Sequence, residues 1–164
     1  MTLFSIRKAH IEDTALILQM IRELAEFEKL LDEVVADEAT LRQSLFFDPK
    51  GPEVLIAEEK GEAVGFVLFF HNFSTFLGRK GIYIEDLYVR QECRGKGYGE
   101  AILKEICRLA RERNCGRVEW WVLDWNERAI NFYKKIGAVP MSEWTVFRMT
   151  EETIGRLLEA VCDR

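Results

Sequence analysis

The chain has 164 residues, of which 48% are hydrophobic and 31% are charged, and this length is typical of one domain with its own core. Its 28 acidic residues outnumber its 23 lysines and arginines, so the formal net charge of −5 argues against binding to a nucleic-acid backbone. No apolar run reaches the roughly 18 residues of a membrane span, and no signal peptide is evident. We therefore expect a single domain over residues 1–164, in the cytoplasm, with neither a nucleic acid nor a membrane as partner.

The first half of the chain is predicted to form a strand, two helices and a hairpin. Alternation begins at Phe4, and apolar residues then recur at helical spacing between Ile17 and Phe27. Asp37 is suited to cap a second helix, and Lys60-Gly61-Glu62 is typical of the turn in a hairpin. In chain order, these elements are a strand over 4–8, a helix that starts at Glu12 or Asp13 and runs to Phe27, a helix over 37–46, and strands over 54–57 and 63–70.

The second half alternates strands with helices. A strand over 82–89 carries Glu85-Asp86 at its middle, and a helix over 100–113 follows it. The remaining predicted elements are a strand over 118–123, a helix over 129–136 closed by Gly137, a strand over 145–149, and a final helix capped by Thr150. The order β-α-α-β-β-β-α-β-α-β-α predicts an α/β or α+β sandwich with a mixed sheet.

The strongest chemical signal is the segment Arg94-Gly95-Lys96-Gly97-Tyr98-Gly99, which lies between a predicted strand and a predicted helix. Its glycines allow a tight turn and a close approach to the main chain, and N–H groups at a helix start bind anions. The spacing matches neither a Walker A loop nor a dinucleotide fingerprint, because Glu100 stands where the latter needs glycine. The segment therefore indicates a pyrophosphate site, with a glycine-rich turn that binds no ligand as the alternative.

An R-G-x-G-x-G segment in this setting resembles the acetyl-CoA loop of the GNAT superfamily of N-acetyltransferases. Residues 84–89 and 127–138, together with Ile6-Arg7 and residues 21–25, are similar to the diamine (spermidine/spermine) N-acetyltransferase family, whose close branch acts on thialysine. The similarity spans nearly the whole chain. It implies a mixed, mostly antiparallel central sheet flanked by helices, acetyl-CoA as cosubstrate, and a homodimer.

The resemblance also assigns residues to the cosubstrate. Backbone groups of Leu87, Tyr88 and Val89 would pair with the pantetheine arm. The pyrophosphate would be held by Arg94, Gly95, Lys96, Gly97, Tyr98, Gly99 and Glu100, and the thiol end would be flanked by Asn126, Glu127, Arg128, Ala129 and Tyr133. No metal is expected, because the four cysteines form no C-x-x-C pair and the chain has two histidines; the cysteines are interpreted as reduced thiols.

The chemistry requires a proton acceptor, because an alkyl amine with a pKa of about 10.4 is almost fully protonated at neutral pH. Glu85 is the candidate acceptor: a carboxylate embedded among apolar strand residues has a raised pKa. Asp86 is the second candidate, and either carboxylate would instead be structural if it faced solvent. A main-chain N–H near Tyr88 or Val89 would polarise the thioester carbonyl. Tyr133 is the candidate acid for the departing thiolate, with simple packing as the alternative.

A small cationic amine needs carboxylates and aromatic faces. The candidate substrate-binding residues are Phe27, Glu28, Glu85, Asp86, Glu119, Trp120, Trp121, Glu143 and Trp144. The chain departs from the polyamine enzymes in a shorter segment over 139–144 and in Thr145, where they carry arginine. These differences leave polyamines and thialysine-like amines both open. The alternative functions are acetylation of a protein lysine or N-terminus, and a non-catalytic, regulatory CoA-binding module.

Overall fold

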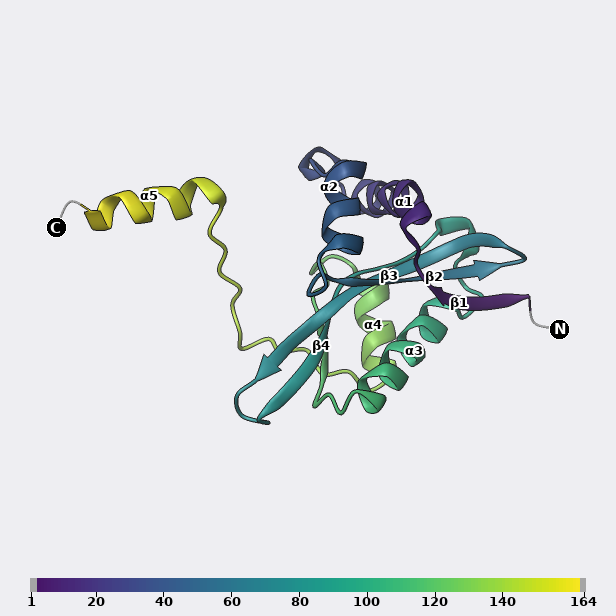
Figure 1. The fold of residues 1–164 in the computed structure, drawn as a ribbon. Helices are drawn as coiled ribbons and strands as arrows, with labels where there is room; N and C mark the ends of the chain where they lie inside the picture. The colour runs from purple at the N-terminus through teal and green to yellow at the C-terminus, as the bar shows by residue number, and fades with distance from the viewer. Residues whose placement is uncertain (1–2, 163–164) are drawn as a thin grey trace. The chain divides into compact units, whose positions relative to one another are not determined.

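The computed structural model describes residues 3–162, with side chains up to residue 159. The chain divides into two compact units, one up to Leu123 and one from Asp124. The first unit contains a five-stranded sheet in the order β1-β2-β3-β4-β5, antiparallel except for the parallel pair β4 and β5 (Figure 1). Its strands are β1 (Phe4–Lys8), β2 (Glu53–Glu59), β3 (Glu62–Ser74), β4 (Arg79–Val89) and β5 (Val118–Trp120).

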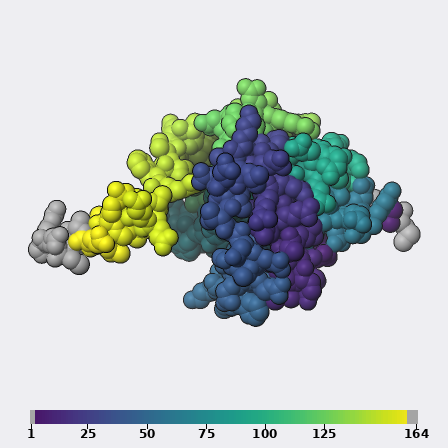
Figure 2. Space-filling view, turned by 90° about the horizontal axis from the view of Figure 1, so that it is seen from above, coloured from purple at the N-terminus to yellow at the C-terminus, as the bar shows by residue number. Residues whose placement is uncertain are grey.

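Three helices cover the two faces of this sheet. They are α1 (Thr14–Phe27), α2 (Glu38–Arg42), which continues as a π-helical turn to Phe47, and α3 (Tyr98–Glu112). Figure 1 shows α1 and α2 on one face and α3 on the other, and α1 and α2 lie side by side in the purple and blue part of Figure 2. Helices therefore lie on both faces of the sheet that contains β4.

Alternating strand residues build a core on each face of the sheet. The core on the α1 side contains Ile17 and Met20 of α1, Val54 and Ile56 of β2, Phe66 and Leu68 of β3 and Tyr88 of β4. Val67, Phe69, Ile82 and Ile84 are buried on the opposite face, and α3 buries Ile102, Leu103 and Ile106. Because side chains of a strand alternate between faces, the position of a residue relative to Tyr88 or Ile84 identifies its face.

Local signals in the sequence place the turns and caps of this unit correctly. Lys60 and Gly61 both have positive φ, 56° and 84°, as a two-residue hairpin turn requires. Asp37 caps α2 by accepting a hydrogen bond from the Thr40 N–H at 2.8 Å. The strand expected over 118–123 ends at Trp120.

The second unit contains α4 (Glu127–Lys135) and α5 (Glu151–Cys162). Asn126 caps α4, Thr150 caps α5, and Gly137 follows α4 with a φ of 93°. The strand predicted over 145–149 is wrong: these residues are exposed and adopt no regular structure. Their β-branched and aromatic residues favour a strand only where a neighbouring strand completes the hydrogen bonds, and no such ladder forms here.

The fold class is nevertheless confirmed. The structure is an α+β sandwich with a mixed, mostly antiparallel central sheet, and the element order agrees with the predicted one except for the absent strand over 145–149. The organisation of residues 1–164 as one domain stays a prediction. Within residues 3–162, no helix combines the length and the apolar character that crossing a membrane requires.

Candidate active site

A bulge in β4 determines which way its two central carboxylates face. Asp86 pairs with Leu68 and Ile84 pairs with Phe69, so Glu85 has no partner on β3. The register places Asp86 on the face of Leu68 and Tyr88, toward α1, where it is partly buried, whereas Glu85 is exposed. The expectation that Glu85 is embedded among apolar residues is therefore wrong, because the extra residue of the bulge shifts that environment to Asp86.

Asp86 is the carboxylate of the site with the largest pKa shift. Burial, together with the charges of Glu85 and Glu28, raises its pKa from 3.8 to about 6. Glu28 follows the last residue of α1, and burial raises its pKa as well. The charges of Glu85, Asp86 and Glu119 all raise the pKa of Tyr83, and the charge of Glu28 raises the pKa of Asp86. We call these four carboxylates the acidic group. The structure thus brings together four carboxylates predicted to bind substrate.

Tyr83 is a member of this site that the sequence analysis missed. Burial and the neighbouring carboxylates raise its pKa to about 12, so the phenol stays protonated. Its ring centroid lies 5.2 Å from that of Phe70 and 5.9 Å from that of Trp121, which meets it edge-on. The available signal was its spacing, two residues before Glu85 in a strand. These rings provide the aromatic surface beside the acidic group.

The β4–β5 register separates the two adjacent tryptophans. Glu119 pairs with Tyr83 and lies on its face, whereas Trp120 pairs with Ile84 and lies on the opposite face. Trp121 returns to the Tyr83 side. Trp120 therefore lies on the other face from Glu119, because adjacent residues of a strand point to opposite faces, and its role in substrate binding stays a prediction.

Glu119 is the carboxylate of the group that already has a cationic partner. Its Oε2 accepts a hydrogen bond from Asn72 Nδ2 at 2.9 Å and forms an ion pair with Arg117 Nε at 2.8 Å. The Oδ1 atom of Asn72 is buried without a hydrogen-bond partner. Glu119 therefore contributes less uncompensated charge than Glu28 and Asp86.

One edge of β4 is open beside these carboxylates. β4 and β5 pair only from Ile82–Val118 to Ile84–Trp120, so residues 85–89 extend past the end of β5. The Arg90 N–H bonds to Val64 of β3, and backbone groups alternate between the edges of a strand. The backbone of Leu87 and Val89 therefore faces the open edge. Tyr88 turns its backbone toward β3 and buries its ring on the α1 side, so it offers no amide at this edge.

The glycine loop at the start of α3 has the geometry that the sequence predicts. Gly95 and Gly97 have φ values of 85° and 84°, and a Cβ at either position would meet no atom within 4 Å. Gly97 is the N-cap of α3, whose first amides have no acceptor within the helix. This left-handed conformation favours glycine, and the open space leaves the main chain accessible to an anion.

The side chains of this loop turn toward the protein. Tyr98 donates a hydrogen bond to Glu59, and Lys96 pairs with the same carboxylate at 3.0 Å. The Tyr98 ring stacks on Phe4 of β1 with centroids 4.6 Å apart. Arg94 donates from Nε to the Val89 carbonyl at 2.9 Å, and its guanidinium lies 4.3 Å from the Phe27 ring centroid. Backbone amides are therefore the main anion donors that the loop presents.

The remaining predicted residues lie in the second unit. Asn126 uses its Oδ1 to accept from the Ala129 N–H at 3.2 Å, and Tyr133 lies in α4 with its ring 5.5 Å from that of Phe132. Glu127 and Arg128 are exposed in the first turn of α4. Glu143 and Trp144 are exposed in a turn closed by a bond from the Trp144 N–H to Met141.

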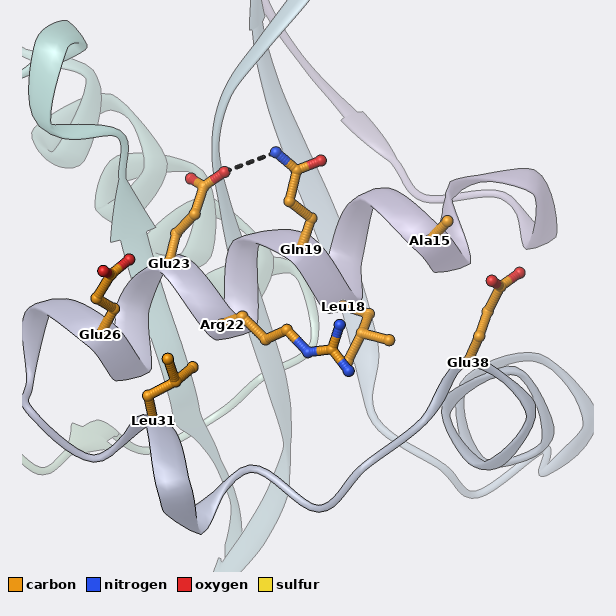
Figure 3. Close-up of a pocket in the computed structure, with 8 residues that line it drawn as sticks. All are labelled: Ala15, Leu18, Gln19, Arg22, Glu23, Glu26, Leu31 and Glu38. Atoms are coloured by element: carbon orange, nitrogen blue, oxygen red, sulfur yellow. Dashed lines mark hydrogen bonds between the residues drawn. The ribbon is translucent and has the colours of Figure 1, made fainter.

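An open pocket along α1 lies apart from the predicted residues. Its volume is about 460 Å³, and Figure 3 shows its lining side chains on α1, together with Leu31 and with Glu38 of α2, and the hydrogen bond between Gln19 and Glu23. The full lining consists of Ala15, Leu18, Gln19, Arg22, Glu23, Glu26, Leu31 and Glu38. None of these was predicted as a site residue.

The comparison with protein families identifies the family of the chain. Residues 18–138 match the Acetyltransferase (GNAT) family. The chain belongs to the GNAT acetyltransferase family. The resemblance inferred from the glycine loop is thereby confirmed, and this GNAT protein is an N-acetyltransferase enzyme.

Individual relatives agree with this assignment. The GNAT chain is 39% identical to a thialysine N-epsilon-acetyltransferase of Bos taurus, over 96% of the chain and 98% of the relative. It is 33% identical to the human spermidine/spermine N(1)-acetyltransferase-like protein 1, over 94% of the chain but 24% of that protein. Among solved structures, an integron cassette protein from V. cholerae has a TM-score of 0.80 at 24% identity, covering 97% of this chain and 99% of that one. The last similarity concerns the fold alone.

Proposed function

We propose that this enzyme transfers the acetyl group of acetyl-CoA to the primary side-chain amine of a small cationic amino compound of the thialysine type. The observation that carries the proposal is the acidic group beside the open edge of β4. Burial raises the pKa values of both Asp86 and Glu28, and repulsion from Glu85 and Glu28 adds to the rise at Asp86. A bound ammonium group would relieve this repulsion, so the site favours a cation.

The residues at the other end of β4 fit acetyl-CoA. The backbone of Leu87 and Val89 faces the open edge and is able to pair with an extended pantetheine arm. Gly95 and Gly97 leave room at the start of α3 for a pyrophosphate. Bound there, acetyl-CoA would supply an activated thioester acyl group. The set of backbone donors explains how a chain with a net charge of −5 accommodates an anionic cosubstrate.

The amine must lose a proton before it reacts. At neutral pH about one alkyl amine in a thousand is neutral, which corresponds to roughly 4 kcal/mol. Asp86, with its pKa at about 6, is deprotonated at neutral pH and is better matched to accept this proton than an ordinary aspartate. Exposed Glu85 lies next to it and would hold the incoming ammonium. This division of roles puts Asp86, the second candidate from the sequence, ahead of Glu85 as the base.

Two further groups complete the proposed chemistry. The Val89 N–H, which faces the open edge of β4, would stabilise the negative charge that develops on the acyl oxygen. Tyr133 would give its proton to the departing thiolate, since a phenol with a pKa of about 10 is matched to a thiol with a pKa of about 8.5. The role of Tyr133 rests on the resemblance of the segment over 131–134 to the acetyltransferase family.

The named relatives favour a thialysine-type amine over a polyamine as the substrate. The thialysine enzyme matches over nearly its whole length, whereas the spermidine/spermine-like protein matches over a quarter of its own. The segment over 139–144 and Thr145 also depart from the polyamine enzymes. The homodimer and the cytoplasmic location expected from the sequence stay predictions.

Thiol release from acetyl-CoA in the presence of different amines tests the proposal. We expect the largest kcat/KM with thialysine, smaller values with lysine and spermidine, and the smallest with a lysine-containing peptide. A peptide that outperforms every small amine would make the enzyme a protein acetyltransferase. CoA binding without turnover of any amine would leave a CoA-binding module. Tyr133→Phe is expected to lower kcat about a hundredfold with little change in the KM for acetyl-CoA.

A further inference from the structure

Arg94 of the glycine loop connects the two ends of the proposed site. Its Nε donates to the Val89 carbonyl at 2.9 Å, and its guanidinium lies 4.3 Å from the Phe27 centroid and 5.7 Å from that of Tyr88. Phe27 is the last residue of α1, and Glu28 of the acidic group follows it directly. One side chain thus links the loop of α3, the open edge of β4 and the end of α1.

A second arginine reinforces this link one helical turn earlier. Arg90 binds Glu23 of α1 through Nε at 3.2 Å and the Ala63 carbonyl through a terminal nitrogen at 2.9 Å. Glu23 and Phe27 are four residues apart on α1, so they lie on one side of the helix. The connection between β4 and α3 therefore holds the last two turns of α1 at two points.

The chain leaves α1 immediately after this contact, through a tight helix end. The Lys29 N–H bonds to Glu26 and the Leu30 N–H bonds to Ala25, with Lys29 at a φ of 62°. This conformation fixes the direction of the chain at Glu28. A shift of the Phe27 ring would therefore be transmitted to the Glu28 carboxylate.

We propose that Arg94 is a positioning residue for the amine substrate: by holding Phe27 it sets the place of Glu28 relative to Asp86. The inference rests on the proposed function and changes the role that the resemblance gives to Arg94. A guanidinium occupied by Val89 and Phe27 acts on the amine end of the site. Because the Arg94 guanidinium covers one face of the Phe27 ring, that face does not bind the substrate cation. Carboxylates hold the cation instead.

Arg94→Lys tests this role, because lysine keeps the charge beside the pyrophosphate loop but lacks the planar group that bonds Val89 and stacks on Phe27 together. We expect the KM for thialysine to rise three- to tenfold, while the dissociation constant of CoA, measured by calorimetry, changes less than twofold. Arg111→Lys, an exposed arginine of α3, is the control and should change neither. Thermal unfolding of each variant verifies that the chain is folded.

Substitutions of Phe27 test whether the two side chains act together. Phe27→Leu should raise the KM for thialysine as much as Arg94→Lys does, whereas the KM of Phe27→Tyr should stay closer to the wild-type value. The double variant with Arg94→Lys and Phe27→Leu should have a KM for thialysine no higher than that of either single variant. The inference is overturned if Arg94→Lys weakens CoA binding more than amine binding, if the amine KM is unchanged, or if the two effects multiply. If the wild-type enzyme turns over no amine, the proposed function itself fails, and calorimetry with CoA distinguishes that outcome.

Discussion

Asp86 combines two properties that are difficult to maintain in one side chain. It is partly buried on the face of Leu68 and Tyr88, beside the apolar core on the α1 side, yet it must be charged to accept a proton. Burial and two neighbouring carboxylates raise its pKa to about 6. At neutral pH the folded chain therefore holds a carboxylate that burial destabilises, and a substrate cation would stabilise it.

The pH dependence of turnover distinguishes Asp86 from Glu85. We expect kcat/KM of the wild-type enzyme to rise with pH through about 6, because protonated Asp86 cannot accept a proton. Asp86→Asn should lower kcat on the order of a hundredfold and remove this limb of the profile. Glu85→Gln, the matched control, should retain the limb and mainly raise the KM for the amine. The opposite pattern would return the base to Glu85.

The raised pKa of Asp86 also predicts a pH-dependent difference in stability between the wild-type protein and Asp86→Asn. The folded-state pKa of Asp86, about 6, lies above its ordinary value of 3.8, so the unfolded chain binds fewer protons between these values. The contribution of Asp86 to wild-type stability therefore falls as pH rises from about 4 to 6. Asp86→Asn should be more stable than wild type at pH 8, by up to about 3 kcal/mol, and the difference should vanish below pH 4. Urea unfolding at several pH values measures it; a less stable variant at pH 8 would contradict the burial argument.

The site carboxylates illustrate which properties of single residues could be predicted from the sequence. Glu85-Asp86, Glu28 and Glu119 were identified as site carboxylates, and the structure brings them to one face. Their individual environments were not predictable, because the bulge at Glu85 depends on the register with β3, which involves residues distant in the sequence. The face of Trp120 was not predictable for the same reason, since it follows from the pairing with Ile84.

At the scale of elements, the end of β4 and the start of α3 together form the proposed cosubstrate site. β4 extends past the end of β5, so its edge at Leu87 and Val89 is open. Gly97, in a left-handed conformation, is the N-cap of α3. The glycine loop was predictable because its conformation is local. The strand expected over 145–149 was not predictable in this way, because a strand depends on a partner.

Gly97→Ala should impair CoA binding beyond its cost in stability. Gly61, in the β2–β3 turn, has the same φ of 84° and the same empty surroundings, so Gly61→Ala is a matched control for strain. Each variant should lose about 1 to 2 kcal/mol of folding free energy. Only Gly97→Ala should also weaken CoA binding, about tenfold or more, because its methyl group would occupy the space of the pyrophosphate. Equal CoA affinities of the two variants, measured by calorimetry, would argue against a phosphate site at Gly97.

At the scale of the whole molecule, the division into two compact units raises the question of whether the chain unfolds as the single domain that the sequence predicts. The segment from Asp124 contains two helices and, among its described residues, no strand. A segment of about forty residues rarely folds alone. We therefore expect one cooperative urea transition, with the same midpoint by far-ultraviolet circular dichroism and by fluorescence of Trp144 after the other three tryptophans are replaced by phenylalanine. Separate midpoints would show two independently stable units.

The charge of the whole molecule predicts opposite effects of salt on its two substrates. A chain with a net charge of −5 attracts a cationic amine and repels anionic acetyl-CoA, and salt screens both interactions beyond about 10 Å at 0.1 M. The KM for thialysine should therefore rise several-fold between about 20 and 200 mM salt, while the KM for acetyl-CoA should fall. Glu28→Gln should flatten the amine dependence. Glu62→Gln, an exposed glutamate at the start of β3, changes the net charge equally and should leave that dependence nearly unchanged. Equal flattening by both variants would mean that the amine responds to the net charge of the chain and not to the acidic group.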